Sequence, residues 1–217
     1  MGALNHNFKD RFNSLPVVVD LETSGLDCYN HAVLEVALVF LAYDGTTLVP
    51  DKTLHYHVEP FKNAKFDPKA MEIHGIRPDH PFRQAVTERA LLEDINLHIA
   101  SELKKHQCRK AILTGHNVNF DLGFLIQASR RCQIKQDIHQ FCVFDTATLS
   151  ALIFGQTVLA RAMHACRIQH DLNEAHSALY DAEQTAKLFC HIVNHSQFDP
   201  LKNSNLPFKY RSKKTSR

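Results

Sequence analysis

The first 60 residues consist of apolar runs separated by short polar breaks, at the spacing typical of β-strands. Residues 17–19 and 34–43 are rich in β-branched and large apolar side chains, and residues 53–60, TLHYHVEP, alternate in the manner of a half-buried strand. Turn residues stand between these runs, at Asn30-His31 and at Asp44-Gly45. The pattern predicts three strands in succession.

Helical spacing follows. Asp67 is suited to cap a short helix, Pro68 to fill its first position and Gly75 to end it. After Thr87 an apolar residue recurs at every fourth position, which predicts a long amphipathic helix. These apolar residues are Leu91, Ile95, Ile99 and Leu103.

The rest of the chain alternates short strands with helices. Strand patterns occupy residues 111–114 and 141–145. Helical patterns run from about 119 to 132, with Asn119 as the expected cap, begin again near residues 146 and 158, and run last from about 176 to 194. Strands first, then helices alternating with further strands, predict an α/β domain with a mixed sheet.

The composition is that of an ordinary globular protein. With 217 residues, 44% of them hydrophobic and 22% charged, a single domain over residues 1–200 is expected. The longest apolar run, residues 32–43, contains Glu35 and is too short to cross a bilayer, and the N-terminus lacks the order of a signal peptide. We therefore expect a soluble, cytoplasmic protein with no membrane partner.

Charge and cysteine usage narrow the function classes. Residues 201–217 carry six basic residues and no acid, whereas residues 1–200 carry 19 basic and 23 acidic residues, a net charge of −4. Such a tail fits a polyanionic partner, and a flexible, solvated tail is the alternative. The six cysteines include no C-x-x-C pair, which argues against a disulfide framework or a zinc ribbon.

Two acids end the most apolar of the early runs, in PVVVDLETSG. Asp20 and Glu22 are two residues apart, so on a strand they point to the same face, and two like charges so close are costly without a cation between them. Oxygen ligands favour Mg²⁺ or Mn²⁺. D-x-E alone is a weak signal, because it recurs at Asp181 and Glu183.

Two later segments add candidates. TGHNVNFDLGFL places Asp121 in the first turn of a helix, where dipole complementation is the simpler alternative. EAHSALYDAEQTA holds His176 and Asp181, whose spacing of five is not that of one helix face. They can share a site only if His176 precedes the helix and Asp181 lies inside it.

Together DLET, HNVNFD and HSALYDAEQTA resemble the three motifs of the DEDDh family of 3′-to-5′ exonucleases, over residues 16–194. The resemblance implies a ribonuclease-H-like mixed five-stranded sheet flanked by helices, and two divalent cations, Mg²⁺ or Mn²⁺. It implies that four acids hold the ions and that His176 is the general base: Asp20, Glu22, Asp121 and Asp181. The hydrolase would then release nucleoside 5′-monophosphates from 3′ ends.

Finer segments resemble the bacterial branch of that family that trims tRNA and other stable RNAs. This likeness implies a homodimer, a single-stranded or 3′-overhang RNA substrate, and phenylalanines that stack on the terminal bases. Phe120 and Phe141 stand at matching places, whereas Leu26 and Ile73 replace the aromatic residues expected at two others. Basic candidates for phosphate contacts are Arg11, Lys104, Lys110 and Lys135.

Three rival interpretations remain at this point. A proofreading DNA exonuclease or an oligoribonuclease would use the same five residues, and the motifs do not distinguish RNA from single-stranded DNA. A nucleic-acid-binding module without turnover is disfavoured because all five residues are present. A zinc protein built on His55, His57 and the cysteines lacks the usual ligand spacing.

Overall fold

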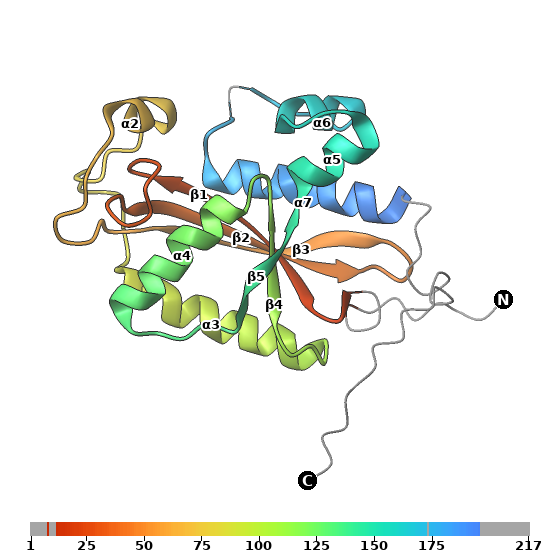
Figure 1. The fold of residues 1–217 in the computed structure, drawn as a ribbon, viewed down its shortest axis with the longest axis horizontal. Helices are drawn as coiled ribbons and strands as arrows, with labels where there is room; N and C mark the ends of the chain where they lie inside the picture. The colour runs from red at the N-terminus through yellow and green to blue at the C-terminus, as the bar shows by residue number, and fades with distance from the viewer. Residues whose placement is uncertain (1–7, 9–11, 173, 196–217) are drawn as a thin grey trace, which may run out of the picture.

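The computed structural model describes residue 8 and residues 12–172 and 174–195, which form one mixed sheet with helices on both faces (Figure 1). The sheet order is β3-β2-β1-β4-β5. β2 pairs antiparallel with β1 and β3, whereas β4 runs parallel to β1 and β5. The predicted mixed sheet is thus confirmed. Its strands are β1 (Leu15–Thr23), β2 (Val33–Tyr43), β3 (Leu48–His57), β4 (Ala111–Gly115) and β5 (Ile138–Asp145).

The helices lie close to the ranges that the apolar spacing predicts. They are α2 (Pro68–His74), α3 (Glu88–Lys105), α4 (Asn119–Cys132), α5 (Thr146–Phe154), α6 (Leu159–Ala165) and α7 (Ala178–His195). Asp67 caps α2 by accepting from the Lys69 N–H, and Gly75 ends it with a φ of 65°. The predicted cap of α4 is wrong: Asn119 is already helical, and Val118 precedes it without a side-chain cap bond.

Helix α7 covers the face of the sheet formed by β1, β2 and β3, and α3 and α4 lie on the opposite side (Figure 1). The hydroxyl of Tyr56 on β3 donates to Asp94 on α3 at 2.6 Å, which ties that second layer to the sheet. Three fully buried alanines on α7 let the helix approach the strands closely: Ala178, Ala182 and Ala186. Any acid on the sheet-facing side of α7 is therefore held near the strands.

The topology also fixes where the predicted motifs meet. Because β1 and β4 are parallel neighbours, their carboxyl ends lie at one edge of the sheet, and ligands of open α/β sheets gather at such an edge. Asp20 and Glu22 are close to the end of β1, and the turn after β4 leads into α4.

Among the described residues, no helix is long and apolar enough to cross a membrane. Residues 201–217 lie outside the described part of the chain, so the basic tail and the domain boundary at residue 200 stay predictions.

Close packing of α7 gives a test. We expect Ala182→Leu to lower the free energy of unfolding by about 1–3 kcal/mol, because a larger side chain has no room against the strands. Lys187→Leu, on the exposed side of the same helix, is the matched control. Urea unfolding of both variants measures the difference, and an equal effect would contradict this packing.

Candidate active site

Asp20 and Glu22 project from the same face of β1, and both side chains are half-buried. The opposing residues on β2 are Ala37 and Glu35. A third carboxylate, on Glu35, therefore lies across the strand from Glu22. Glu35 is itself buried, with 6% of its surface exposed.

Asp121 is buried in the first turn of α4. Its carboxylate accepts from backbone N–H groups, including that of Leu21 on β1, so the start of α4 is bound to the end of β1. This placement differs from simple dipole complementation at an exposed helix end. The side chain points back over the sheet and lies beside Asp20 and Glu22. At this position the charge of Asp121 raises the pKa of Asp20, and the charge of Glu22 raises the pKa of Asp121.

His176 and Asp181 meet by the route that their spacing requires. His176 lies in the bend before α7, in the left-handed region with a φ of 67°, while Asp181 is in the first turn. The backbone N–H of His176 donates to Asp181 Oδ2 at 2.9 Å. Ligand atoms of Glu22, His176 and Asp181 all lie within 4.8 Å of one another. The structure thus brings the predicted acids and the imidazole to one edge of the sheet.

Burial raises the pKa of each of the four predicted metal-binding acids. Burial raises the pKa of Glu22 to about 8, with Asp181 and Glu35 adding to the effect. Burial first, then the neighbouring acids, raises the pKa of Asp20 well above its ordinary range. Burial also raises the pKa values of Asp121 and Asp181, although the N–H of His176 partly offsets the increase for Asp181.

This donor set fits a divalent metal centre. Four carboxylates offer hard oxygen ligands, and a cation relieves the repulsion that otherwise favours their protonated forms. Two of the acids stand on a rigid strand and two at helix N-termini, so little rearrangement is needed to present them together.

Other residues hold the loop before α4 in place. His116 contacts Thr146 Oγ1 at 3.0 Å and the Thr157 carbonyl at 2.7 Å through its two ring nitrogens. Asp145 accepts from the backbone N–H of Asn117 at 3.1 Å, and Asn117 has a φ of 66°. The sequence reasoning missed these contacts and also missed Glu35, whose one visible signal was a charge within an apolar run.

The predicted base-stacking residues differ in exposure. Leu26, Ile73 and Phe141 are 80%, 60% and 87% exposed, which leaves them free to meet a ligand. Phe120 is partly buried and packs against Phe124, with ring centroids 4.9 Å apart. It therefore offers less of its face than Phe141.

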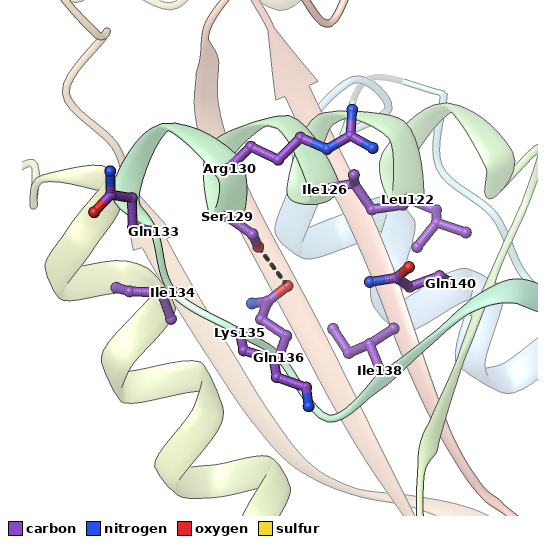
Figure 2. A pocket seen from close by; sticks show the side chains of 10 residues that line it. All are labelled: Leu122, Ile126, Ser129, Arg130, Gln133, Ile134, Lys135, Gln136, Ile138 and Gln140. Atoms are coloured by element: carbon purple, nitrogen blue, oxygen red, sulfur yellow. Dashed lines mark hydrogen bonds between the residues drawn. The ribbon is translucent and has the colours of Figure 1, made fainter.

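The basic candidates are dispersed. Lys104 is exposed, and Lys110 forms an ion pair with Asp137 at 2.7 Å. Lys135 and Arg130 line a cavity of about 320 Å³ between α4 and the start of β5, which includes none of the five predicted catalytic residues (Figure 2). Arg11 lies outside the described residues.

Comparison with known families gives the class of protein. The sequence profile of the family described as exonuclease matches residues 17–189, a range that contains all five predicted catalytic residues. The chain therefore belongs to the exonuclease family, whose chemistry is hydrolysis of nucleic acids with divalent metal ions.

The curated relatives with the finer similarity are named ribonuclease T. That of Vibrio campbellii is 48% identical over 190 residues, 86% of this chain and 89% of the relative. That of Yersinia pestis is 45% identical over 196 residues, 89% of this chain and 90% of the relative. The finer sequence resemblance, which is to bacterial ribonuclease T, is thus confirmed.

Solved structures show the same fold at low identity. Escherichia coli exonuclease I in complex with a dT13 oligonucleotide superimposes with a TM-score of 0.65 at 18% identity, over 88% of this chain and 43% of that one. A zinc-bound exonuclease I complex with single-stranded DNA gives a TM-score of 0.64. The chain spans less than half of exonuclease I, and the likeness confirms the ribonuclease-H-like fold alone.

The raised pKa of Glu22 gives a test in chelator. Folded protein holds a proton on Glu22 up to about pH 8, whereas the unfolded chain releases it above 4.5. The free energy of unfolding should therefore fall as pH rises from 6 to 8, by up to about 1.4 kcal/mol per pH unit for each such carboxyl. Urea unfolding at both pH values measures this slope.

Glu22→Gln removes the titrating group and should make the slope smaller, whereas Glu93→Gln, on the exposed surface of α3, should leave it unchanged. A slope in Glu22→Gln equal to that of the original protein would show that Glu22 is not the group responsible.

Proposed function

We propose that the protein is a metal-dependent 3′-to-5′ exoribonuclease that trims the 3′ ends of tRNA and other stable RNAs. The observation that carries this proposal is the convergence of Glu22, His176 and Asp181, whose ligand atoms lie within 4.8 Å of one another at the edge where Asp20 also stands. The names of the relatives support RNA as the substrate, and family membership supports hydrolysis.

The four carboxylates would hold two divalent ions, with Mg²⁺ or Mn²⁺ suited to an all-oxygen donor set. Such a pair supplies an activated water and stabilises the leaving 3′ oxygen of an in-line displacement. His176 contributes the base: it is exposed and close to Glu22 and Asp181, and an imidazole is the side chain that most often serves as a general base. The product is a nucleoside 5′-monophosphate.

Asp181 has a second task, because it also accepts the backbone N–H of His176 at 2.9 Å. That bond fixes the bend that presents the imidazole. Loss of the Asp181 oxygen would therefore displace the base as well as remove a carboxylate from the cluster.

Exposed side chains around the cluster would grip the terminal nucleotides of a single strand. Phe141 offers a ring for stacking, and Leu26 and Ile73 offer aliphatic surfaces that contact a base without a π-face. We therefore expect weaker selection of the terminal base than an all-aromatic site would give. Phe120, which is partly buried, would contribute less than Phe141.

The proposal also includes a homodimer and a cytoplasmic location. It further includes phosphate contacts by Arg11, Lys104, Lys110 and Lys135. The support is the sequence resemblance to ribonuclease T. Lys110 would have to leave Asp137 to reach a phosphate, so Lys104 and Lys135, which are exposed, are the stronger candidates.

Product analysis tests the reaction. With Mg²⁺, a 3′-overhang RNA should shorten from its 3′ end and release nucleoside 5′-monophosphates, and a chelator should stop the reaction because the carboxylates lose their cations. Chromatography of the products, with a matched DNA strand in parallel, measures it. Faster degradation of the DNA, or of mismatched duplex ends, would favour the proofreading alternative.

Substitutions test the roles of the residues. Asp181→Asn should reduce cleavage to background, while Glu183→Gln, two residues further on the same helix, should leave it near normal. His176→Ala should lower kcat by about 10²–10⁴ with little change in KM, because the base acts in the chemical step. His164→Ala, an exposed histidine on α6, is the control.

Steady-state assays with a 5′-end-labelled RNA at several substrate concentrations measure both effects. Near-normal turnover in Asp181→Asn would contradict the metal role. A His176→Ala variant with a raised KM and an unchanged kcat would assign the imidazole to substrate binding.

A further inference from the structure

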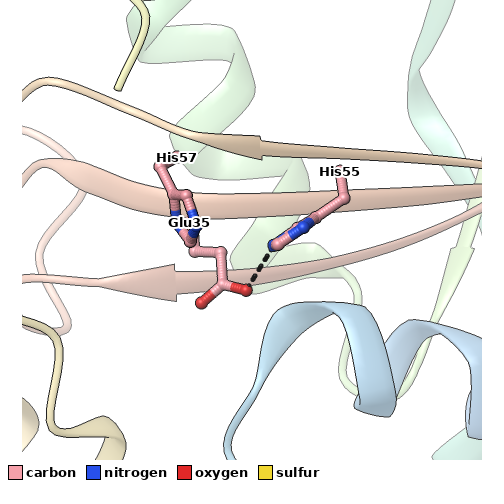
Figure 3. A group of neighbouring side chains, drawn as sticks. All are labelled: Glu35, His55 and His57. Carbon is pink, nitrogen blue, oxygen red and sulfur yellow. Dashed lines mark hydrogen bonds and ion pairs between the residues drawn. The ribbon is translucent and has the colours of Figure 1, made fainter. Parts of the chain in front are cut away.

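A second group of potential ligands lies beside the acidic cluster. Glu35, His55 and His57 come from β2 and β3, and one ligand atom from each lies within 4.8 Å of the others (Figure 3). None of the five predicted catalytic residues belongs to this group. The sequence pointed to His55 and His57 but not to Glu35, because 20 residues separate Glu35 from His55.

Strand register explains why the three side chains meet. Glu35 is directly opposite His57, so the two share a face of the sheet. His55 is opposite Ala37, whose small side chain leaves room for the imidazole to reach diagonally to Glu35. His55 Nε2 lies 2.6 Å from Glu35 Oε1.

One polar atom in this group lacks a partner. His57 Nδ1 is buried and has no hydrogen bond to any described residue. In His74, by contrast, both ring nitrogens have partners: Nε2 contacts the Thr23 carbonyl and Nδ1 accepts from the Ile76 N–H. A buried ring nitrogen without a partner is costly, and a bound cation would remove that cost.

We propose that Glu35, His55 and His57 bind a transition-metal dication, with Zn²⁺ the best fit, at a site separate from the carboxylate cluster. Two imidazoles and one carboxylate are a ligand set that zinc accepts, with a water completing four-coordination. Tetrahedral coordination requires ligand atoms about 3.3 Å apart, so the side chains would rotate from their observed spacing of up to 4.8 Å to hold the ion. The all-oxygen cluster, in contrast, favours Mg²⁺.

Access and charge are compatible with an ion. β3 is an edge strand, and the side chain of His55 is 31% exposed, so solvent reaches the group from that side. The acids of the neighbouring cluster face the same side of the sheet and attract cations. Arg83 is the nearby cation, and its guanidinium is engaged by the carbonyls of Val58 and Leu34.

The site revises the zinc alternative raised from the sequence. Cysteines do not contribute, because no described cysteine belongs to either candidate metal group. The third ligand is instead Glu35. A dication here would lie one strand from Glu22, so its occupancy would weaken cation binding at the carboxylate cluster through repulsion.

Metal titration of the full chain carrying Asp20→Asn and Asp181→Asn tests the proposal, because these changes disable the carboxylate cluster. Co²⁺, added alone as a visible probe for Zn²⁺, should bind with one equivalent and give the strong absorption of a four-coordinate site. Zn²⁺ should displace it, and excess Mg²⁺ should not. This readout does not depend on nuclease activity.

Glu35→Gln and His57→Ala, each added to that background, should weaken Co²⁺ binding at least tenfold, whereas His164→Ala should leave it unchanged. Glu35→Gln is matched in size, and circular dichroism checks that each variant folds. Absence of Co²⁺ binding in the background protein would overturn the proposal, as would Co²⁺ binding by Glu35→Gln and His57→Ala that is as tight as that of the background protein.

Discussion

Repulsion among carboxylates at the end of β1 is the constraint on which this structure depends. Two unit charges 4 Å apart repel by about 1 kcal/mol in water and by about 4 kcal/mol at the dielectric typical near a protein surface. Asp20 and Glu22 stand one pleat apart and face Asp121 and Asp181. Burial first, and then this repulsion, raises the pKa values of Asp20 and Glu22, and a cation is the natural substitute for those protons.

The fold keeps the four acids together because each of them stands on a rigid element. A strand holds Asp20 and Glu22, and helix N-termini hold Asp121 and Asp181, where the helix dipole favours negative charge. Buried alanines on α7 bring Asp181 down to the sheet, and the bond from the His176 N–H fixes the bend before it. Packing energy of the whole domain thus maintains an arrangement that electrostatics alone would disperse.

The exposed large apolar side chains of the described residues include aliphatic as well as aromatic ones. Leu26 and Ile73 are exposed aliphatic side chains, while Phe141 presents an exposed ring. The relatives named ribonuclease T are 45–48% identical to this chain, and the exonuclease family model matches residues 17–189. The histidines of β3 add a nitrogen-rich group beside the oxygen-rich one.

The sequence by itself determined the elements and the chemistry-bearing motifs. The period of apolar residues, with Asp67 and Gly75, predicted helix ranges close to those of the structure, because these signals act within a few residues of the chain. The strand bounds were less accurate, since β3 spans Leu48–His57 rather than the predicted residues 53–60. The requirement that His176 precede the helix containing Asp181 also followed from spacing alone.

Tertiary structure decided the rest. Strand register placed Glu35 between Glu22 and His57, and α4 began at Asn119 without the predicted cap because Asp121 and the surrounding contacts hold its first turn. Register and side-chain convergence arise from pairing between residues distant in sequence, and no local pattern encodes which residue will stand opposite which.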